Sequence, residues 1–103
     1  LESSLSQIWV MQTSFGLPVG QIRFDIEQEI VKISYSLDPI ARGRGWGSIL
    51  VDLGINKIND SVKGRIVQSM VKKSNPASKK IFINLDFTEK VKNEVLTFRK
   101  RIN

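Results

Sequence analysis

Hydrophobic and polar residues alternate along two stretches near the start of the chain. Ile22, Phe24 and Ile26 are separated by polar residues, and the same period of two runs from Val31 to Leu37. This period is typical of strands that bury one face. With a short apolar run before them, these stretches predict three consecutive antiparallel strands, at Ile8 to Gln12, Val19 to Ile26 and Ile30 to Leu37.

The later part of the chain has other patterns. Between Ile49 and Ile58 the apolar residues cover more than one stripe of a helix, which predicts a helix buried against a sheet. Asn75 and Pro76 are a preferred N-cap and a preferred first residue for a second helix. Three more strands are predicted, the last two as a hairpin, at Ile66 to Val71, Thr88 to Lys92 and Val95 to Ile102.

The composition fits one small globular domain. The chain has 103 residues, of which 41% are hydrophobic and 25% are charged. No apolar run approaches the roughly 20 residues of a membrane-spanning helix, and no signal peptide is recognisable, so we expect a cytoplasmic setting. Residues 1–6 are serine-rich and without period, so we interpret them as a linker or edge, followed by a domain at residues 7–103.

Cysteine and histidine are both absent from the sequence. Their absence excludes disulfides, thiol nucleophiles and imidazole bases, and with them the usual zinc sites. Any catalysis must therefore use carboxylates, hydroxyls, amines, backbone groups or water.

The net charge of +6 indicates an anionic partner. One interpretation is a basic module that binds nucleic acid, with an affinity that falls steeply as salt is added. The basic residues are dispersed, however, and no aromatic stacking ladder, zinc module or recognition helix accompanies them. We therefore expect no nucleic acid and favour a phosphorylated small molecule.

The segment from Ala41 to Ser48 contains three glycines in alternation and lies between a predicted strand and a predicted helix. Such glycines let the backbone turn tightly and bring its N–H groups close to an anion at the helix N-terminus. The segment is therefore a candidate binding loop for a phosphate or pyrophosphate. The alternative is an ordinary strand-to-helix turn with two solvated arginines.

Two motifs consist of Arg42, Gly43, Gly45 and Gly47 in this loop, and of Asn75, Ser78 and Phe87 further along the chain. They resemble the pyrophosphate loop and the later helix and strand of the GNAT superfamily of acyl-coenzyme A N-acyltransferases. The resemblance runs from Ile8 onward and implies a mixed α+β fold, a largely antiparallel twisted sheet with two main helices. The family's usual first strand and first two helices have no counterpart, so we expect a fragment or part of a longer polypeptide.

The resemblance implies an N-acetyltransferase in which a primary amine attacks the thioester of acetyl-coenzyme A directly. Within the site, Trp46 is expected to pack as the first apolar residue of its helix, and Asn75 also to cap a helix. The backbone beside the thioester would be that of Ser36 and Leu37. The cofactor-binding residues that the resemblance implies are Ser36, Leu37, Arg42, Gly43, Arg44, Gly45, Trp46, Gly47, Asn75 and Ser78.

Proton transfer has three candidate residues. Asp25 and Glu27 are the nearest carboxylates on the central strands, although the pattern favours a solvated strand face for both. Tyr35, the only tyrosine, could protonate the departing thiolate or pack in the core. Phe82 stands where many family members have a tyrosine for this step. Asp86 replaces a glycine that often has a positive φ, which aspartate tolerates better than most residues.

The acceptor and the partners have several interpretations. Trp9-Val10 and residues 18–25 are similar to acetyltransferases that act on nucleotide-linked amino sugars in bacterial surface-polysaccharide biosynthesis. Phe82 leaves open a second hypothesis, a coenzyme A-binding module of a larger protein with weak or no catalysis. Expected partners are a small amine and either a second copy, joined through an unpaired sheet edge, or a fused upstream domain.

Overall fold

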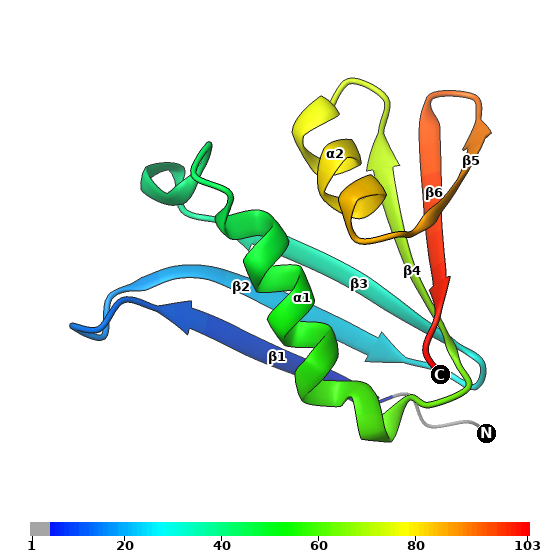
Figure 1. Ribbon diagram of the computed structural model, residues 1–103, viewed down its shortest axis with the longest axis horizontal. Coiled ribbons are helices and arrows are strands. Elements are labelled where there is room, and N and C mark those ends of the chain that lie inside the picture. The colour runs from blue at the N-terminus through cyan, green and yellow to red at the C-terminus, as the bar shows by residue number, and fades with distance from the viewer. Residues whose placement is uncertain (1–4) are drawn as a thin grey trace.

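The structure, a computed structural model, describes residues 5–103 as one six-stranded sheet with two α-helices (Figure 1). The elements are β1 (Leu5–Gln12), β2 (Pro18–Ile26), β3 (Ile30–Leu37), α1 (Trp46–Ile58), β4 (Ile66–Lys72), α2 (Pro76–Asn84), β5 (Thr88–Lys92) and β6 (Val95–Arg101). Their order confirms the predicted one. Of the predicted linker, only Leu5 and Ser6 lie within the described residues, and both belong to β1 rather than to a loop. No helix in residues 5–103 is long and apolar enough to cross a membrane.

The sheet has the strand order β1-β2-β3-β4-β6-β5, and its neighbouring strands are antiparallel except for β3 and β4. β3 and β4 are paired from Ile30 to Lys32 and from Ile66 to Gln68, and then they diverge (Figure 1). The divergence divides the sheet into a half of β1-β2-β3 and a half of β4-β6-β5. This largely antiparallel mixed sheet confirms the expected α+β class.

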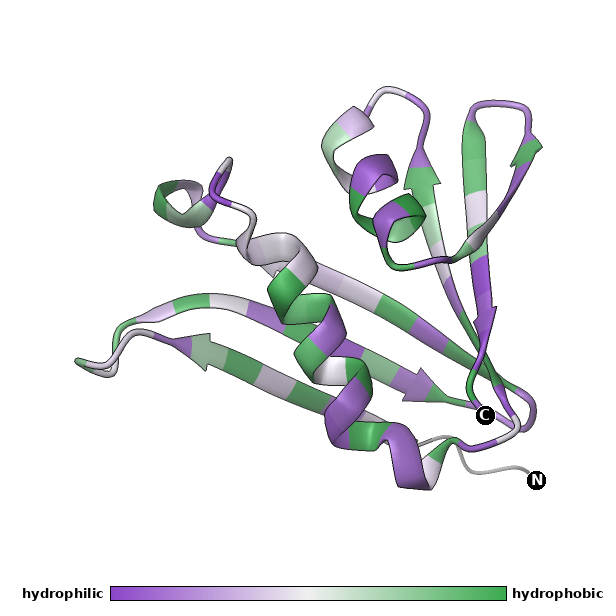
Figure 2. Cartoon of the chain, in the orientation of Figure 1, coloured by the Kyte–Doolittle hydropathy of each residue, from purple (hydrophilic) through white to green (hydrophobic). Residues whose placement is uncertain are grey.

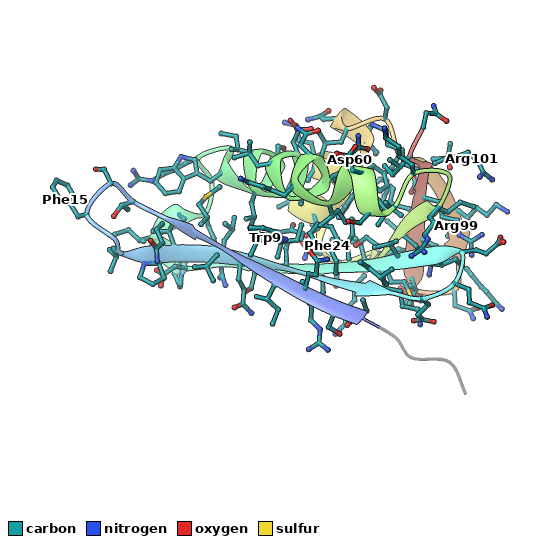
Figure 3. The ribbon with its side chains drawn as sticks, turned by 90° about the horizontal axis from the view of Figure 1, so that it is seen from below. Trp9, Phe15, Phe24, Asp60, Arg99 and Arg101 are labelled. Atoms are coloured by element: carbon teal, nitrogen blue, oxygen red, sulfur yellow. The ribbon has the colours of Figure 1, made fainter. Side chains whose placement is uncertain are left out.

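α1 packs across β2 through a narrow stripe of residues. Ile22 and Phe24 are fully buried, and a β-carbon built on Gly54 would lie 3.0 Å from side-chain atoms of both. Figure 3 shows Phe24 between the sheet and α1, and Figure 2 shows hydrophobic and hydrophilic residues alternating along β2. The predicted burial of this helix against the sheet is confirmed for Leu50, Val51 and Ile58. Its other apolar residues are not all covered, since Ile49 and Leu53 are 49% and 52% exposed.

Both ends of α2 follow from local chemistry. The side chain of Asn75 accepts a hydrogen bond from the Ser78 backbone N–H at 3.2 Å, and Pro76 begins the helix, as predicted. After the helix, Asp86 has a φ of 67°, the left-handed conformation that glycine adopts most readily. Aspartate therefore occupies the same kind of turn that the sequence predicted for this position.

Phe82 holds α2 on the sheet. Its side chain is fully buried, and its ring contacts those of three other aromatic residues. The ring centroids lie at 6.2 Å from Tyr35, 5.1 Å from Phe87 and 5.5 Å from Phe98. Because Tyr35 is on β3 and Phe98 is on β6, this aromatic cluster connects the two halves of the sheet beyond the point where β3 and β4 separate.

Candidate active site

A cavity of about 700 Å³ lies where β3 diverges, next to the N-terminal turns of α1 and α2. Most of the cofactor-binding residues predicted from the sequence line it: Ser36, Leu37, Arg42, Gly43, Gly45, Gly47, Asn75 and Ser78. Tyr35 lines it as well. Arg44 and Trp46 do not line it; Arg44 is exposed, and Trp46 is half-buried at the first position of α1, as expected for a packing residue.

The glycine loop ends in an open helix N-terminus. Gly43 and Gly45 have φ values of 74° and 77°, and a β-carbon on either would meet no atom within 4 Å, so the loop presents bare backbone. Gly45 is the N-cap of α1 and makes no side-chain cap. The first backbone N–H groups of this 13-residue helix therefore keep their capacity to bind an anion, whereas those of α2 are capped by Asn75.

The second backbone element of the cavity is the free edge of β3. The Asp38 N–H donates to the Val19 carbonyl at 2.8 Å, which makes these residues a hydrogen-bonded pair between β3 and β2. Since residues along an antiparallel strand alternate in direction, Ile33, Tyr35 and Leu37 direct their backbone groups away from β2. The first part of β3 uses this direction to pair with β4, up to Lys32, and the last part, from Tyr35 to Leu37, lines the cavity.

The charged side chains that line the cavity are cationic. Arg42 and Lys80 lie at its rim, and no aspartate or glutamate lines it among the described residues. The Arg42 Nε donates to the Leu37 carbonyl at 3.3 Å, which holds the guanidinium close to the end of β3. The arrangement of cations, glycine loop and helix N-terminus favours a ligand with negative charge at one end.

Tyr35 is half-buried and reaches from β3 to α2. Its hydroxyl forms a hydrogen bond of 2.5 Å with the Ser78 hydroxyl, and either oxygen can be the donor. The edge of Phe82 supports its ring, with an angle of 61° between the two ring planes. Its ring therefore packs in the aromatic cluster, which is one of the two roles that the sequence left open, and its hydroxyl lies at the cavity.

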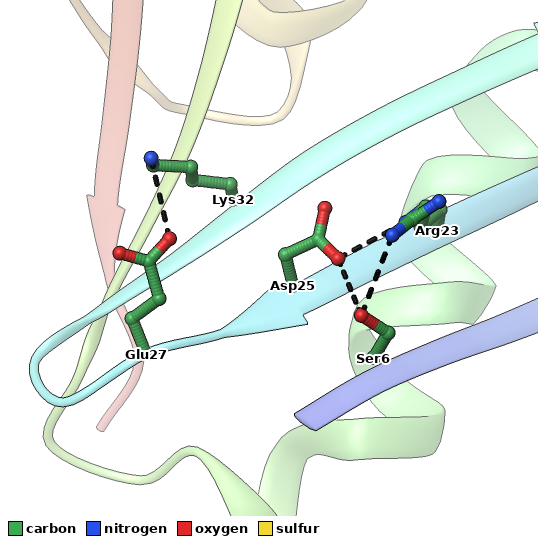
Figure 4. Close-up of polar contacts among 5 residues, drawn as sticks. All are labelled: Ser6, Arg23, Asp25, Glu27 and Lys32. Carbon is green, nitrogen blue, oxygen red and sulfur yellow. Dashed lines mark hydrogen bonds and ion pairs between the residues drawn. The ribbon is translucent and has the colours of Figure 1, made fainter. Parts of the chain in front are cut away.

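The two predicted carboxylates lie elsewhere (Figure 4). Asp25 accepts hydrogen bonds from the Ser6 hydroxyl at 2.6 Å and from the Arg23 Nε at 3.0 Å, and Glu27 pairs with Lys32 at 3.2 Å. The hydrogen bond from Ser6, followed by the contact with Arg23, lowers the pKa of Asp25. Asp25 alternates with residues buried under α1, so it faces the opposite side of the sheet. The structure does not bring either carboxylate to the cavity.

Sequence reasoning missed five residues of the cavity wall, one on α1 and four on α2. The missed residues are Ser48, Ala77, Lys80, Ile81 and Asn84. A signal was present for four of them, because Ala77, Lys80, Ile81 and Asn84 recur at the three- and four-residue spacing of one helix face. That spacing identifies a common face but not what the face borders.

No family model matches the sequence, and no curated protein matches it. Solved structures do match. The GNAT superfamily phosphinothricin acetyltransferase of Sinorhizobium meliloti, in complex with acetyl-coenzyme A, is similar with a TM-score of 0.78 and 17% identity, over 93% of this chain. The ribosomal-protein-S5-alanine acetyltransferase of Vibrio fischeri is similar with a TM-score of 0.83 and 16% identity, over 96% of this chain.

A third similar structure is the N-acetyltransferase PseH of Campylobacter jejuni, in complex with acetyl-coenzyme A. Its TM-score is 0.79 and its identity 19%, over 95% of this chain. The chain spans 60% of the Sinorhizobium protein, 63% of the Vibrio protein and 69% of PseH. At these identities the likeness concerns the course of the backbone: the chain has the fold of the GNAT superfamily acetyltransferases.

Proposed function

We propose that this chain is an N-acetyltransferase that transfers the acetyl group of acetyl-coenzyme A to a primary amine. The observation that carries the proposal is the meeting, in one cavity, of two backbone elements that can accept a ligand. One is the uncapped N-terminus of α1, preceded by the glycine loop, and the other is the free edge of β3. A pyrophosphate joined to an extended amide arm fits both at once.

The residues present fit this cofactor. The backbone from Gly43 to Gly47 would hold the pyrophosphate, and Arg42 would add charge beside it. The backbone groups of Ile33, Tyr35 and Leu37 would pair with the amide arm in the manner of an added strand. The Leu37 N–H, which points away from β2, would donate to the thioester carbonyl oxygen, and a fixed donor of this kind is worth about 10²- to 10³-fold in rate.

Acetyl-coenzyme A supplies an activated acyl group with a thiolate leaving group. Because the chain has no cysteine, the proposal has the amine attack this acyl group directly, without an acetylated thiol on the protein. No carboxylate from the described residues lines the cavity to take a proton from the amine. The amine needs its lone pair for the attack and must be neutral, so in this proposal water takes its ammonium proton.

Within this proposal the acceptor is a nucleotide-linked amino sugar. The support is the resemblance carried by Trp9-Val10 and residues 18–25. Those residues lie on two adjacent strands, Trp9 and Val10 on β1 and residues 18–25 on β2 (Figure 1). The acceptor's own phosphates would add to the negative charge that the cationic chain attracts.

Calorimetry with acetyl-coenzyme A, followed by a thiol-release assay with a panel of amines, tests the proposal. The panel contains nucleotide-linked amino sugars, the same sugars without the nucleotide, and simple alkyl amines. We expect binding of acetyl-coenzyme A and thiol release with the nucleotide-linked amines first. Absence of binding would refute the function, whereas binding without turnover by the natural full-length chain would favour a non-catalytic coenzyme A-binding module.

A further inference from the structure

We infer that the Tyr35 hydroxyl, positioned by Ser78, is the group that protonates the departing thiolate. The inference rests on the proposed function and deepens it, since it assigns the proton donor to β3 rather than to the aromatic position on α2. It starts from the hydrogen bond of 2.5 Å between the two hydroxyls, both of which line the cavity.

Phe82 has no part in proton transfer. It carries no hydroxyl, and its side chain is fully buried among Tyr35, Phe87 and Phe98. Its edge-on contact with Tyr35 supports the tyrosine ring from the core side. The α2 aromatic residue therefore fixes the ring that carries the hydroxyl, and the hydroxyl itself comes from the neighbouring strand.

Ser78 holds the other end of the hydrogen bond in a fixed place. It lies in the first turn of α2, where its backbone N–H donates to the Asn75 side chain at 3.2 Å. The hydrogen bond between Tyr35 and Ser78 joins β3 to α2. It lies next to Ser36 and Leu37, the last residues of β3, which also line the cavity. Ser78 is therefore a positioning residue for the Tyr35 hydroxyl.

The other protic groups of the cavity fit the step less well. Ser36 and Ser48 carry aliphatic hydroxyls, which are far weaker acids than a phenol. Lys80 and Arg42 are exposed at the rim, where their charges suit the phosphates of the ligand. Tyr35 is half-buried and next in sequence to the residues whose backbone would border the thioester.

The amine lone pair forms the new carbon–nitrogen bond, and the carbon–sulfur bond breaks with its electron pair on sulfur. The Tyr35 hydroxyl gives its proton to sulfur, which yields the free thiol of coenzyme A. Water takes the proton that the nitrogen loses, and Tyr35 regains a proton from water.

The kinetic test compares three single-residue variants of the natural full-length chain. Tyr35→Phe keeps the ring and removes the acid, so we expect kcat to fall about 10²-fold or more while KM for acetyl-coenzyme A stays near the wild-type value. Ser78→Ala should lower kcat by a smaller factor, again without a change in KM. The matched control is Ser34→Ala, on β3 one residue from Tyr35 but exposed on the other face, which should keep both constants.

A spectroscopic readout is independent of turnover. Tyr35 is the only tyrosine of this sequence, and subtracting the spectrum of Tyr35→Phe isolates its contribution to the ultraviolet difference spectrum. We expect coenzyme A to change the spectrum and desulfo-coenzyme A, which lacks the sulfur, to leave it largely unchanged. A wild-type kcat in Tyr35→Phe, or equal spectra with the two ligands, would overturn the inference about Tyr35. The proposed function would still stand if the wild type is active. Failure of the wild type to bind acetyl-coenzyme A would overturn both.

Discussion

The δ-carbon of Ile81 lies 2.5 Å from the position that a β-carbon on Gly47 would take. The first turn of α1 therefore approaches α2 as closely as a glycine allows. Both residues line the cavity, so this contact sets the distance between its two helical walls.

Gly47→Ala should narrow the cavity. The added methyl forces the end of the Ile81 side chain to rotate, at a cost of about 1 kcal/mol, and moves it into the space for the ligand. We expect weaker binding of acetyl-coenzyme A, measured by calorimetry, and a small loss of stability in urea unfolding.

The control for Gly47→Ala is Gly54→Ala in the same helix, where the new methyl would lie 3.0 Å from Ile22 and Phe24 and away from the cavity. It should lose stability and keep the affinity of the wild type. An equal loss of affinity in both variants would show that the Gly47–Ile81 contact has no special part in binding.

Gly45→Ala should weaken binding through the backbone. Gly45 has a φ of 77°, and an alanine there costs about 1 to 2 kcal/mol or turns the backbone N–H groups away from the anion. The matched change is Gly16→Ala, which has a φ of 84° and equally open surroundings in the β1–β2 turn. Both variants should melt at lower temperatures, but affinity for acetyl-coenzyme A should fall in Gly45→Ala alone. Unchanged affinity there would argue against the glycine loop as the pyrophosphate site.

Phe82→Tyr should not improve catalysis. A hydroxyl at this position enters the closed aromatic cluster, where an unpaired polar group costs about 1 to 3 kcal/mol. We expect a lower free energy of unfolding and no rise in kcat. Higher kcat in this variant would mean that the α2 aromatic position reaches the thioester, contrary to the role given to Tyr35.

Asp25 makes stability depend on pH. The hydrogen bonds from Ser6 and Arg23 lower its pKa below the ordinary value of 3.8, so the carboxylate stabilises the fold at pH values above 3.8. This stabilisation is lost as the pH falls through the lowered pKa. Asp25→Asn should therefore melt below the wild type at neutral pH and together with it in strong acid, as followed by circular dichroism.

The same variant tests whether Asp25 is the catalytic base. Because the side chain faces away from the cavity, Asp25→Asn should turn over acetyl-coenzyme A at the wild-type rate. A loss of kcat together with loss of an acidic limb in its pH profile would restore Asp25 as a candidate. Ser6→Ala should reproduce part of the change in melting temperature without altering the rate.

The parts of the fold that the sequence predicted depend on local patterns. β3 begins at Ile30 and ends at Leu37, as its alternation and the following proline required, and Asn75 caps α2. The glycine loop was likewise identified from three residues in alternation. The local sequence determines such features, so they can be predicted without knowing how the rest of the chain folds.

The parts that the sequence did not predict depend on the arrangement in space. The hydroxyls of Tyr35 and Ser78 meet across 43 residues of chain, which no period reveals. Alternation placed Asp25 on one face of β2, but only the sheet and its helices show that this face lies away from the cavity. Lys80 and Asn84 share one helix face, but only the tertiary fold shows that this face borders the cavity beside β3.

The separation of β3 from β4 leaves the halves of this sheet joined by a short seam of backbone pairing. Beyond this short pairing, side chains hold the two halves together. Phe82 contacts Tyr35 on one half and Phe98 on the other. A ligand that pairs with the free edge of β3 would also contact α2 in the wall of the cavity, and it would stabilise the two halves together. Binding of a ligand in the cavity should therefore raise the unfolding temperature of the whole domain, so the unfolding temperature reports on occupancy.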